Sequence, residues 1–71
     1  MRRSDLERKI AKAAKAAGVE WRHVGSKGNH DKWRLGATVQ VSIPRHSEVN
    51  EITAESVLKA TEQELGERWW K

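Results

Sequence analysis

Three side chains that could bind or protonate an oxyanion recur at every second position of one short segment. His30, Lys32 and Arg34 follow the turn-forming stretch Gly-Ser-Lys-Gly at residues 25–28. A histidine titrates near neutral pH, so it can take a proton from a ribose 2′-hydroxyl or give one to a departing 5′-oxygen. Neighbouring cations would stabilise the charge that builds on the phosphate. The spacing therefore suits metal-free RNA cleavage, although it also suits an ordinary solvated strand face.

These side chains share a face only if their segment is a β-strand. Period-two alternation and β-branched or aromatic residues predict three strands, over residues 19–25, 29–35 and 38–43. Turns are expected at residues 26–28 and at Gly36, which makes the three strands an antiparallel meander. The register of the first strand stays open, because Val19, Trp21 and His23 fall on one face and Val24 on the other.

Alternation along the second and third strands separates apolar from polar side chains. The set expected to face a core is Trp33, Leu35, Val39, Val41 and Ile43. The set expected on the opposite, open face is His30, Lys32, Arg34, Thr38, Gln40 and Ser42. The open face would then combine a histidine, two cations and three hydrogen-bonding groups beside a glycine turn whose amides can approach a ligand closely.

Two helices are expected to cover the apolar face of this sheet. Ser4 and Glu7 have the spacing of a capping box, and Gly18 is a typical stop. Apolar residues at helical spacing between them are Leu6, Ile10, Ala13, Ala14 and Ala17, and the far side carries Arg8, Lys9, Lys12 and Lys15.

The chain after the third strand predicts a second helix. Pro44 should end the strand because it has no amide hydrogen, and Thr53 is the expected N-cap. The expected apolar face is Ala54, Val57, Leu58, Thr61 and Leu65. The order α-β-β-β-α predicts an α+β fold, with a three-stranded antiparallel sheet and both helices on one face.

Length and composition limit the class of protein. A chain of 71 residues is expected to form one domain over residues 1–71, with a thin core and no deep substrate cavity. It contains no cysteine, which excludes disulfides and thiolate zinc sites, and no apolar run long enough to cross a bilayer. We therefore expect a soluble, cytoplasmic protein that does not bind membranes.

Positive charge is concentrated in the first half of the chain. Residues 1–34 hold ten Lys and Arg against four Asp and Glu, whereas residues 35–71 hold four against six. This asymmetry favours a polyanionic partner such as RNA, although a solvated face that aids solubility has the same pattern. His23, His30 and His46 lack a recognisable metal-ligand spacing, so no metal is expected.

The order of these motifs resembles the HicA family of RNA-cleaving toxins. The resemblance covers nearly the whole chain: a first helix ending at Gly18, then Gly28-Asn29-His30, then a Val-rich strand closing with residues 43–46 (Ile-Pro-Arg-His), then a final helix. It implies a fold similar to double-stranded-RNA-binding domains and cleavage of messenger RNA without metal or cofactor. It also implies inhibition by a HicB-type antitoxin protein.

Carried onto this sequence, the family's Gly-Ser-His-like motif places the catalytic histidine at His30. Asn29 stands where a small hydroxyl residue is expected but still offers a hydrogen-bonding side chain. The expected RNA contacts are Lys27, Gly28, Asn29, Lys32, Arg34 and Arg45. His46 is either a second proton-transfer group or a loop residue that fixes the Pro44 turn through hydrogen bonds.

Two other functions fit the same sequence. A non-catalytic RNA-binding module of the same fold would depend on Arg8, Lys12 and Lys15 rather than on His30. A protein-interaction module would use Trp69 and Trp70 as anchors. A helix continuing past residue 66 would instead place Trp69 at the edge of the apolar face, where it would close the core.

Overall fold

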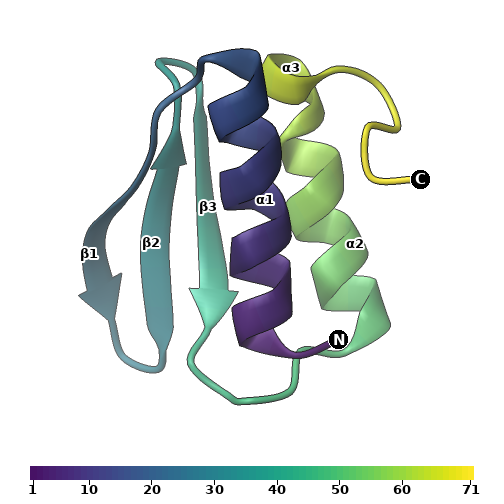
Figure 1. The fold of residues 1–71 in the computed structure, drawn as a ribbon. Coiled ribbons are helices and arrows are strands. Elements are labelled where there is room, and N and C mark those ends of the chain that lie inside the picture. Colours follow the sequence, from purple (N-terminus) through teal and green to yellow (C-terminus); the bar gives the residue numbers. More distant parts are fainter.

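One open sheet of three antiparallel strands lies against the helices in the computed structural model, which describes residues 1–71 (Figure 1). The strands pair in the order β1-β2-β3. The elements are α1 (Arg3–Ala17), β1 (Trp21–Lys27), β2 (His30–Leu35), β3 (Val39–Pro44), α2 (Glu51–Ala60) and α3 (Glu62–Leu65). The predicted α-β-β-β-α layout is confirmed, with the last helix divided in two at Thr61. No helix has the length and apolarity needed to span a bilayer.

The core lies between the sheet and the helices. Its buried apolar residues are Leu6, Ile10, Ala14, Leu35, Val39, Val41, Ile43, Val49, Ala54, Val57 and Leu58. Trp21 and Trp33 stack with ring centroids 4.7 Å apart and extend this core towards the β1 edge. The predicted inward set of β2 and β3 is confirmed, which leaves the alternate residues of both strands on the open face.

Helix α1 ends as predicted but begins differently. Gly18 adopts a left-handed conformation (φ +71°), and its N–H bonds to the carbonyls of Ala14 and Lys15. The predicted capping box is wrong, because the N-cap is Arg2 and no side chain caps the helix. The start of the helix instead pairs with the loop after β3: Arg2 forms an isolated bridge with Glu48, and the Arg3 N–H donates to the Ser47 carbonyl. A tertiary contact thus replaces a local cap.

The turn between β1 and β2 is shorter than predicted. Ser26 and Lys27 belong to β1, opposite Asp31 and His30, so the turn is only Gly28–Asn29. Gly28 has φ +59°, which glycine adopts without strain. The predicted turn over residues 26–28 is therefore wrong for Ser26 and Lys27, which pair with β2, and right only for Gly28.

A β-bulge decides the register that the sequence leaves open. His23 lies opposite Trp33, but Gly25 lies opposite Lys32, so Val24 is an extra residue in β1. The bulge directs Trp21 and His23 towards the helices. It leaves Arg22 and Lys27 on the open face with β2's cations.

The N-terminus of α2 also differs from the prediction. Asn50, not Thr53, is the N-cap, and its side-chain oxygen accepts from the Thr53 N–H at 2.8 Å. The helix therefore starts at Glu51, three residues earlier than the predicted cap allows. Ala54, Val57 and Leu58 are buried as predicted.

The C-terminal tryptophans pack on the core without a continuing helix. Helix α3 ends at Leu65, and Gly66 follows with φ +98°, so the predicted extension is wrong. The chain turns back, and the Trp69 indole N–H donates to the buried Thr61 hydroxyl at 2.7 Å. Trp69 and Trp70 meet edge to face, and both pack against the core. The predicted packing role of Trp69 is confirmed.

Candidate functional site

His30 is the first residue of β2, at the end of the sheet where the Gly28–Asn29 turn lies. It pairs with Lys27 of β1 on one side and Pro44 of β3 on the other. Directly opposite residues of paired strands project to the same face, so His30 and Lys27 share the open face. The imidazole is exposed to solvent. His30 is therefore placed to exchange a proton with a ligand that approaches this face.

The remaining cations of β2 lie on the same face. Lys32 is opposite Gly25 and Ser42, and Arg34 is opposite Arg22 and Gln40. The predicted outward placement of His30, Lys32 and Arg34 is thus confirmed by the register. Gln40 and Ser42 are also exposed there and add hydrogen-bonding groups.

Acidic side chains are nearly absent from this face. The outward positions of the three strands carry no acidic residue. Glu20, which precedes β1, has one carboxylate oxygen 3.7 Å from Arg22 Nε, and both side chains are exposed. Arg34 makes one long contact, from Nη2 to the Ala37 carbonyl at 3.4 Å. An anionic ligand would find cations here that are not already neutralised.

The prediction that Thr38 contributes to the open face is wrong. Its hydroxyl donates to Glu64 Oε2 of α3 at 2.7 Å, and its backbone N–H points to the same oxygen. The Thr38 hydroxyl bond holds the pKa of Glu64 below its usual value. A Cβ at Gly36 would lie only 2.5 Å from this carboxylate. Thr38 and Gly36 therefore dock the β2–β3 turn onto α3.

The side chain of Arg45 lies apart from those of the other predicted RNA contacts. Its guanidinium Nε donates to Asp31 Oδ1 at 2.9 Å, and Asp31 lies on the helix-facing side of β2. Its backbone N–H donates to the carbonyl of Asn29, so the main chain stays beside the turn. The structure thus brings Lys27, Lys32 and Arg34 together around one face but engages the Arg45 side chain elsewhere.

A polar cluster of His23, Asp31 and Arg45, which the sequence did not predict, lies on the helix-facing side. His23 Nε2 lies 3.2 Å from the same Asp31 oxygen that Arg45 contacts. The hydrogen bonds from Arg45 and then His23 lower the pKa of Asp31. Regular pairing of β1 and β2 from the Gly28–Asn29 turn, without a bulge, would place His23 opposite Arg34. The bulge shifts His23 to the other face, beside Asp31. No local sequence signal marks that bulge.

Glu7 of α1 borders this cluster, and its pKa is shifted in the direction opposite to that of Asp31. Burial raises the pKa of Glu7, while the nearby Arg3 guanidinium, 3.9 Å away, lowers it less. Arg3 also donates to the Arg45 carbonyl at 3.2 Å. The cluster therefore joins α1 to the end of the sheet that carries His30.

His46 is exposed in the loop between β3 and α2. That loop is held by backbone bonds, from Arg3 N–H to Ser47 and from Val49 N–H to Met1, and not through the His46 ring as one prediction had it. A proton-transfer role for His46 stays a prediction.

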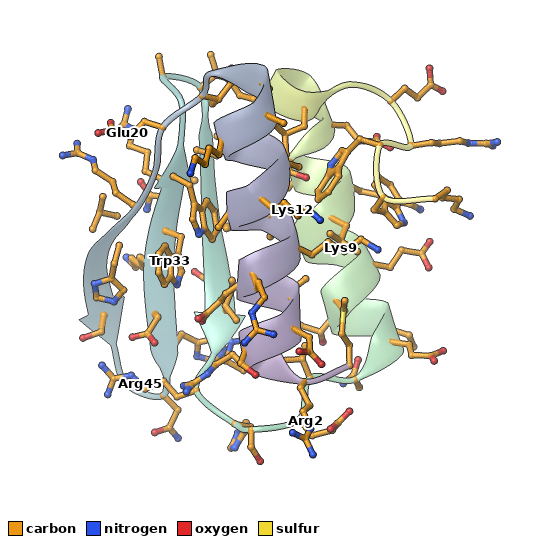
Figure 2. All side chains as sticks on the ribbon, viewed as in Figure 1. Arg2, Lys9, Lys12, Glu20, Trp33 and Arg45 are labelled. Atoms are coloured by element: carbon orange, nitrogen blue, oxygen red, sulfur yellow. The ribbon has the colours of Figure 1, made fainter.

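The basic side of α1 forms a separate surface. Arg8, Lys12 and Lys15 are exposed, and Arg8 lies 3.7 Å from Asp5. Figure 2 shows Lys9 and Lys12 extending from α1 on the side towards α2, away from the sheet, whereas Arg45 lies at the end of the sheet. A ligand on the open face would not touch this surface.

Comparison with protein-family models, with curated proteins and with solved structures finds no match for the chain. What the protein does is therefore inferred from the residues and the geometry described above.

Proposed function

We propose that the protein is a metal-independent endoribonuclease of the HicA toxin type, with His30 as the general acid and base. One observation carries the proposal: an exposed histidine begins β2 on a face that it shares with Lys27, Lys32 and Arg34 and with no carboxylate of these strands. The resemblance of the motif order to HicA toxins supports the same function. In the cell, the proposed target is messenger RNA in the cytoplasm, and the proposed inhibitor is a HicB-type antitoxin.

The proposed reaction uses the nucleophile that RNA itself carries. His30 removes the proton from a ribose 2′-hydroxyl, and the 2′-oxygen forms a bond to the adjacent phosphorus. The bond from phosphorus to the 5′-oxygen breaks, and the protonated imidazole returns its proton to that oxygen. The products are a 2′,3′-cyclic phosphate and a 5′-hydroxyl end.

The surrounding groups would stabilise the phosphorane-like transition state. Lys27 and Lys32 are the cations nearest to His30 in the strand register, and both would face the charge that develops on the phosphate oxygens. The Gly28–Asn29 turn adds backbone amides that a phosphate can approach closely, because glycine has no side chain there.

The test is incubation of the purified protein with RNA in excess EDTA, with an all-deoxy strand of the same sequence as control. We expect cleavage of the RNA alone and a 2′,3′-cyclic phosphate or its opened product at the new end. Cleavage of the deoxy strand, or a strict requirement for a divalent ion, would contradict the mechanism.

A second candidate function is a non-catalytic RNA-binding module that uses α1. The exposed row of Arg8, Lys12 and Lys15 favours it. Charge reversal discriminates the two: Lys32→Glu should weaken RNA binding if the open face is the site, and Lys12→Glu if α1 is. Lys59→Glu on α2, where Lys59 lies 3.3 Å from Glu55, is the matched control and should change little.

A further inference from the structure

Two arginines face each other directly across β1 and β2 on the open face. Arg22 pairs with Arg34, one position beyond the His23–Trp33 pair. Side chains in such pairs have Cβ atoms only about 4.5–5.5 Å apart, and like charges there destabilise a sheet. The pair therefore lowers the stability of a small domain unless a ligand between the two guanidinium groups offsets the repulsion.

Neither arginine is neutralised within the protein. The contact between Arg22 and Glu20 is 3.7 Å long, and the two side chains are 59% and 71% exposed, so water screens it strongly. Arg34 has no carboxylate partner and reaches only the Ala37 carbonyl. On the helix-facing side, by contrast, Asp31 holds Arg45 at 2.9 Å. The arrangement leaves both Arg22 and Arg34 free for an external anion.

The pair lies in line with the proposed catalytic histidine. His30, Lys32 and Arg34 occupy alternate positions of β2, so Arg34 lies about 13 Å from His30 along the strand. Stacked nucleotides rise about 3.4 Å each, so this distance spans about four of them, and fewer if the strand is stretched. A strand with its scissile phosphate at His30 would therefore bring another phosphate to the arginines.

We propose that Arg22 and Arg34 together bind one backbone phosphate of a single-stranded RNA that lies along β2, with its scissile phosphate at His30. The inference rests on the proposed ribonuclease function and assigns to it a second phosphate site. Guanidinium groups bind phosphate oxygens in a bidentate manner, so two facing arginines suit one phosphodiester well. A single strand is the fitting substrate because the 2′-oxygen must attack in line with the departing oxygen, a geometry that a stacked duplex opposes.

Substrate length tests the site separately from the chemistry. We compare the wild type with Arg22→Gln and Arg34→Gln on a dinucleotide and on a single strand of about twelve nucleotides, long enough to reach the arginines on either side of the cut. On the long strand, each variant should lower kcat/KM about tenfold, as expected for a lost hydrogen bond to a charged group. On the dinucleotide, the variants should match the wild type.

The control is Arg68→Gln, which removes an exposed arginine from the segment after α3. That C-terminal segment lies across the helices from the sheet (Figure 1). The variant should leave both substrates unaffected. Equal losses on the long strand and the dinucleotide, or no loss on the long strand, would overturn the second phosphate site while leaving His30 chemistry intact. If the two arginine variants lowered kcat/KM on a fully paired duplex as much as on the single strand, the single-strand assignment would be overturned.

An anion titration tests the arginine pair even if the protein cleaves no RNA, in which case the proposed function fails separately. Without added anion at low salt, Arg34→Gln should raise Tm by about 1–5 °C by relieving the repulsion. Inorganic phosphate should then raise Tm of the wild type more than that of Arg34→Gln, because only the wild type has both partners. Identical phosphate shifts in the two proteins would overturn the anion site.

Discussion

On the open face of the sheet, His30, Lys32 and Arg34 lie beside Arg22 with no carboxylate of the strands among them, whereas on the helix-facing side Asp31 holds both His23 and Arg45. All of these residues except Arg45, which follows β3, come from the β1–β2 hairpin, and His30 and Asp31 are adjacent in the sequence. The charges of one side are paired within the protein, and those of the other side are left for solvent or a ligand.

Under the proposed function, this difference would let one small domain separate stability from binding. Paired charges at Asp31 fasten β1, β2 and the segment after β3 to one another, which keeps the His30 end of the sheet in place. The cations of the open face have no closely paired carboxylate within the sheet, and the Arg22–Arg34 pair opposes the fold. Substitutions on the open face should therefore change RNA cleavage more than stability, and substitutions on the helix-facing side should change stability more than RNA cleavage.

The largest expected effect is the loss of cleavage in His30→Ala. Removing the proposed acid and base should lower the rate of RNA cleavage by about 10²–10⁴-fold. The outward, exposed position predicts a change in the free energy of unfolding of no more than about 0.5 kcal/mol. Cleavage assays and thermal melts monitored by circular dichroism measure the two quantities.

His46→Ala is the matched control for that experiment, because it removes an exposed histidine from the adjacent loop. A folded His30→Ala protein that cleaves RNA as fast as the wild type would remove the central argument for catalysis. Equal losses in the two variants would instead assign His46 the second proton-transfer role.

The next largest effect should fall on the side that carries the core. Trp69→Ala removes a half-buried indole and its hydrogen bond to Thr61, and it should lower the free energy of unfolding by about 2–3 kcal/mol. RNA cleavage below the melting temperature should be unchanged. Trp70→Ala, which removes no indole hydrogen bond, should cost less; a larger loss for Trp70 would contradict the packing seen here.

The Asp31 cluster predicts a pH-dependent loss of stability. Because the pKa of Asp31 is lowered in the folded protein, its contribution is present above its ordinary value of 3.8 and is lost as the pH falls through the folded-state value. Asp31→Asn should therefore lower Tm at neutral pH, and its difference from the wild type should shrink below about pH 4. A difference that does not change with pH would show that the charge of Asp31 is not what stabilises the cluster.

The smallest effect, of opposite sign, is expected at Glu7. Burial raises its pKa above 4.5 in the folded protein, so the stability that this group contributes is lost as the pH rises through that folded-state value. Glu7→Gln should slightly raise Tm at neutral pH, and the gain should disappear at more acidic pH. Thermal melts at pH 7 and pH 4 measure the change, and a Tm of Glu7→Gln below that of the wild type at pH 7 would mean that the Arg3 contact outweighs the cost of burial.

Much of the fold could be predicted because its signals are local. The stop of α1 at Gly18 and the alternation of β2 and β3 depend on backbone sterics and on the burial of every second side chain. The predicted starts of α1 and α2 were both wrong. The N-terminal segment pairs with the distant loop at Ser47, and Asn50 competes with Thr53 as the cap of α2. Of the candidate site, only the shared face of His30, Lys32 and Arg34 could be predicted, because it follows from the alternation of β2.

The faces that the residues of β2 occupy follow from the sequence alone, because a strand's period of two leaves no other choice once its apolar residues are buried. The concentration of positive charge in the first half of the chain is also a property of the sequence. Which of these charges are neutralised depends instead on how distant segments pack together. The bulge at Val24 brings His23 to Asp31 and Arg22 to Arg34, and the chain after Pro44 turns Arg45 towards Asp31. Those pairings depend on register between segments distant in sequence, and no single segment encodes them.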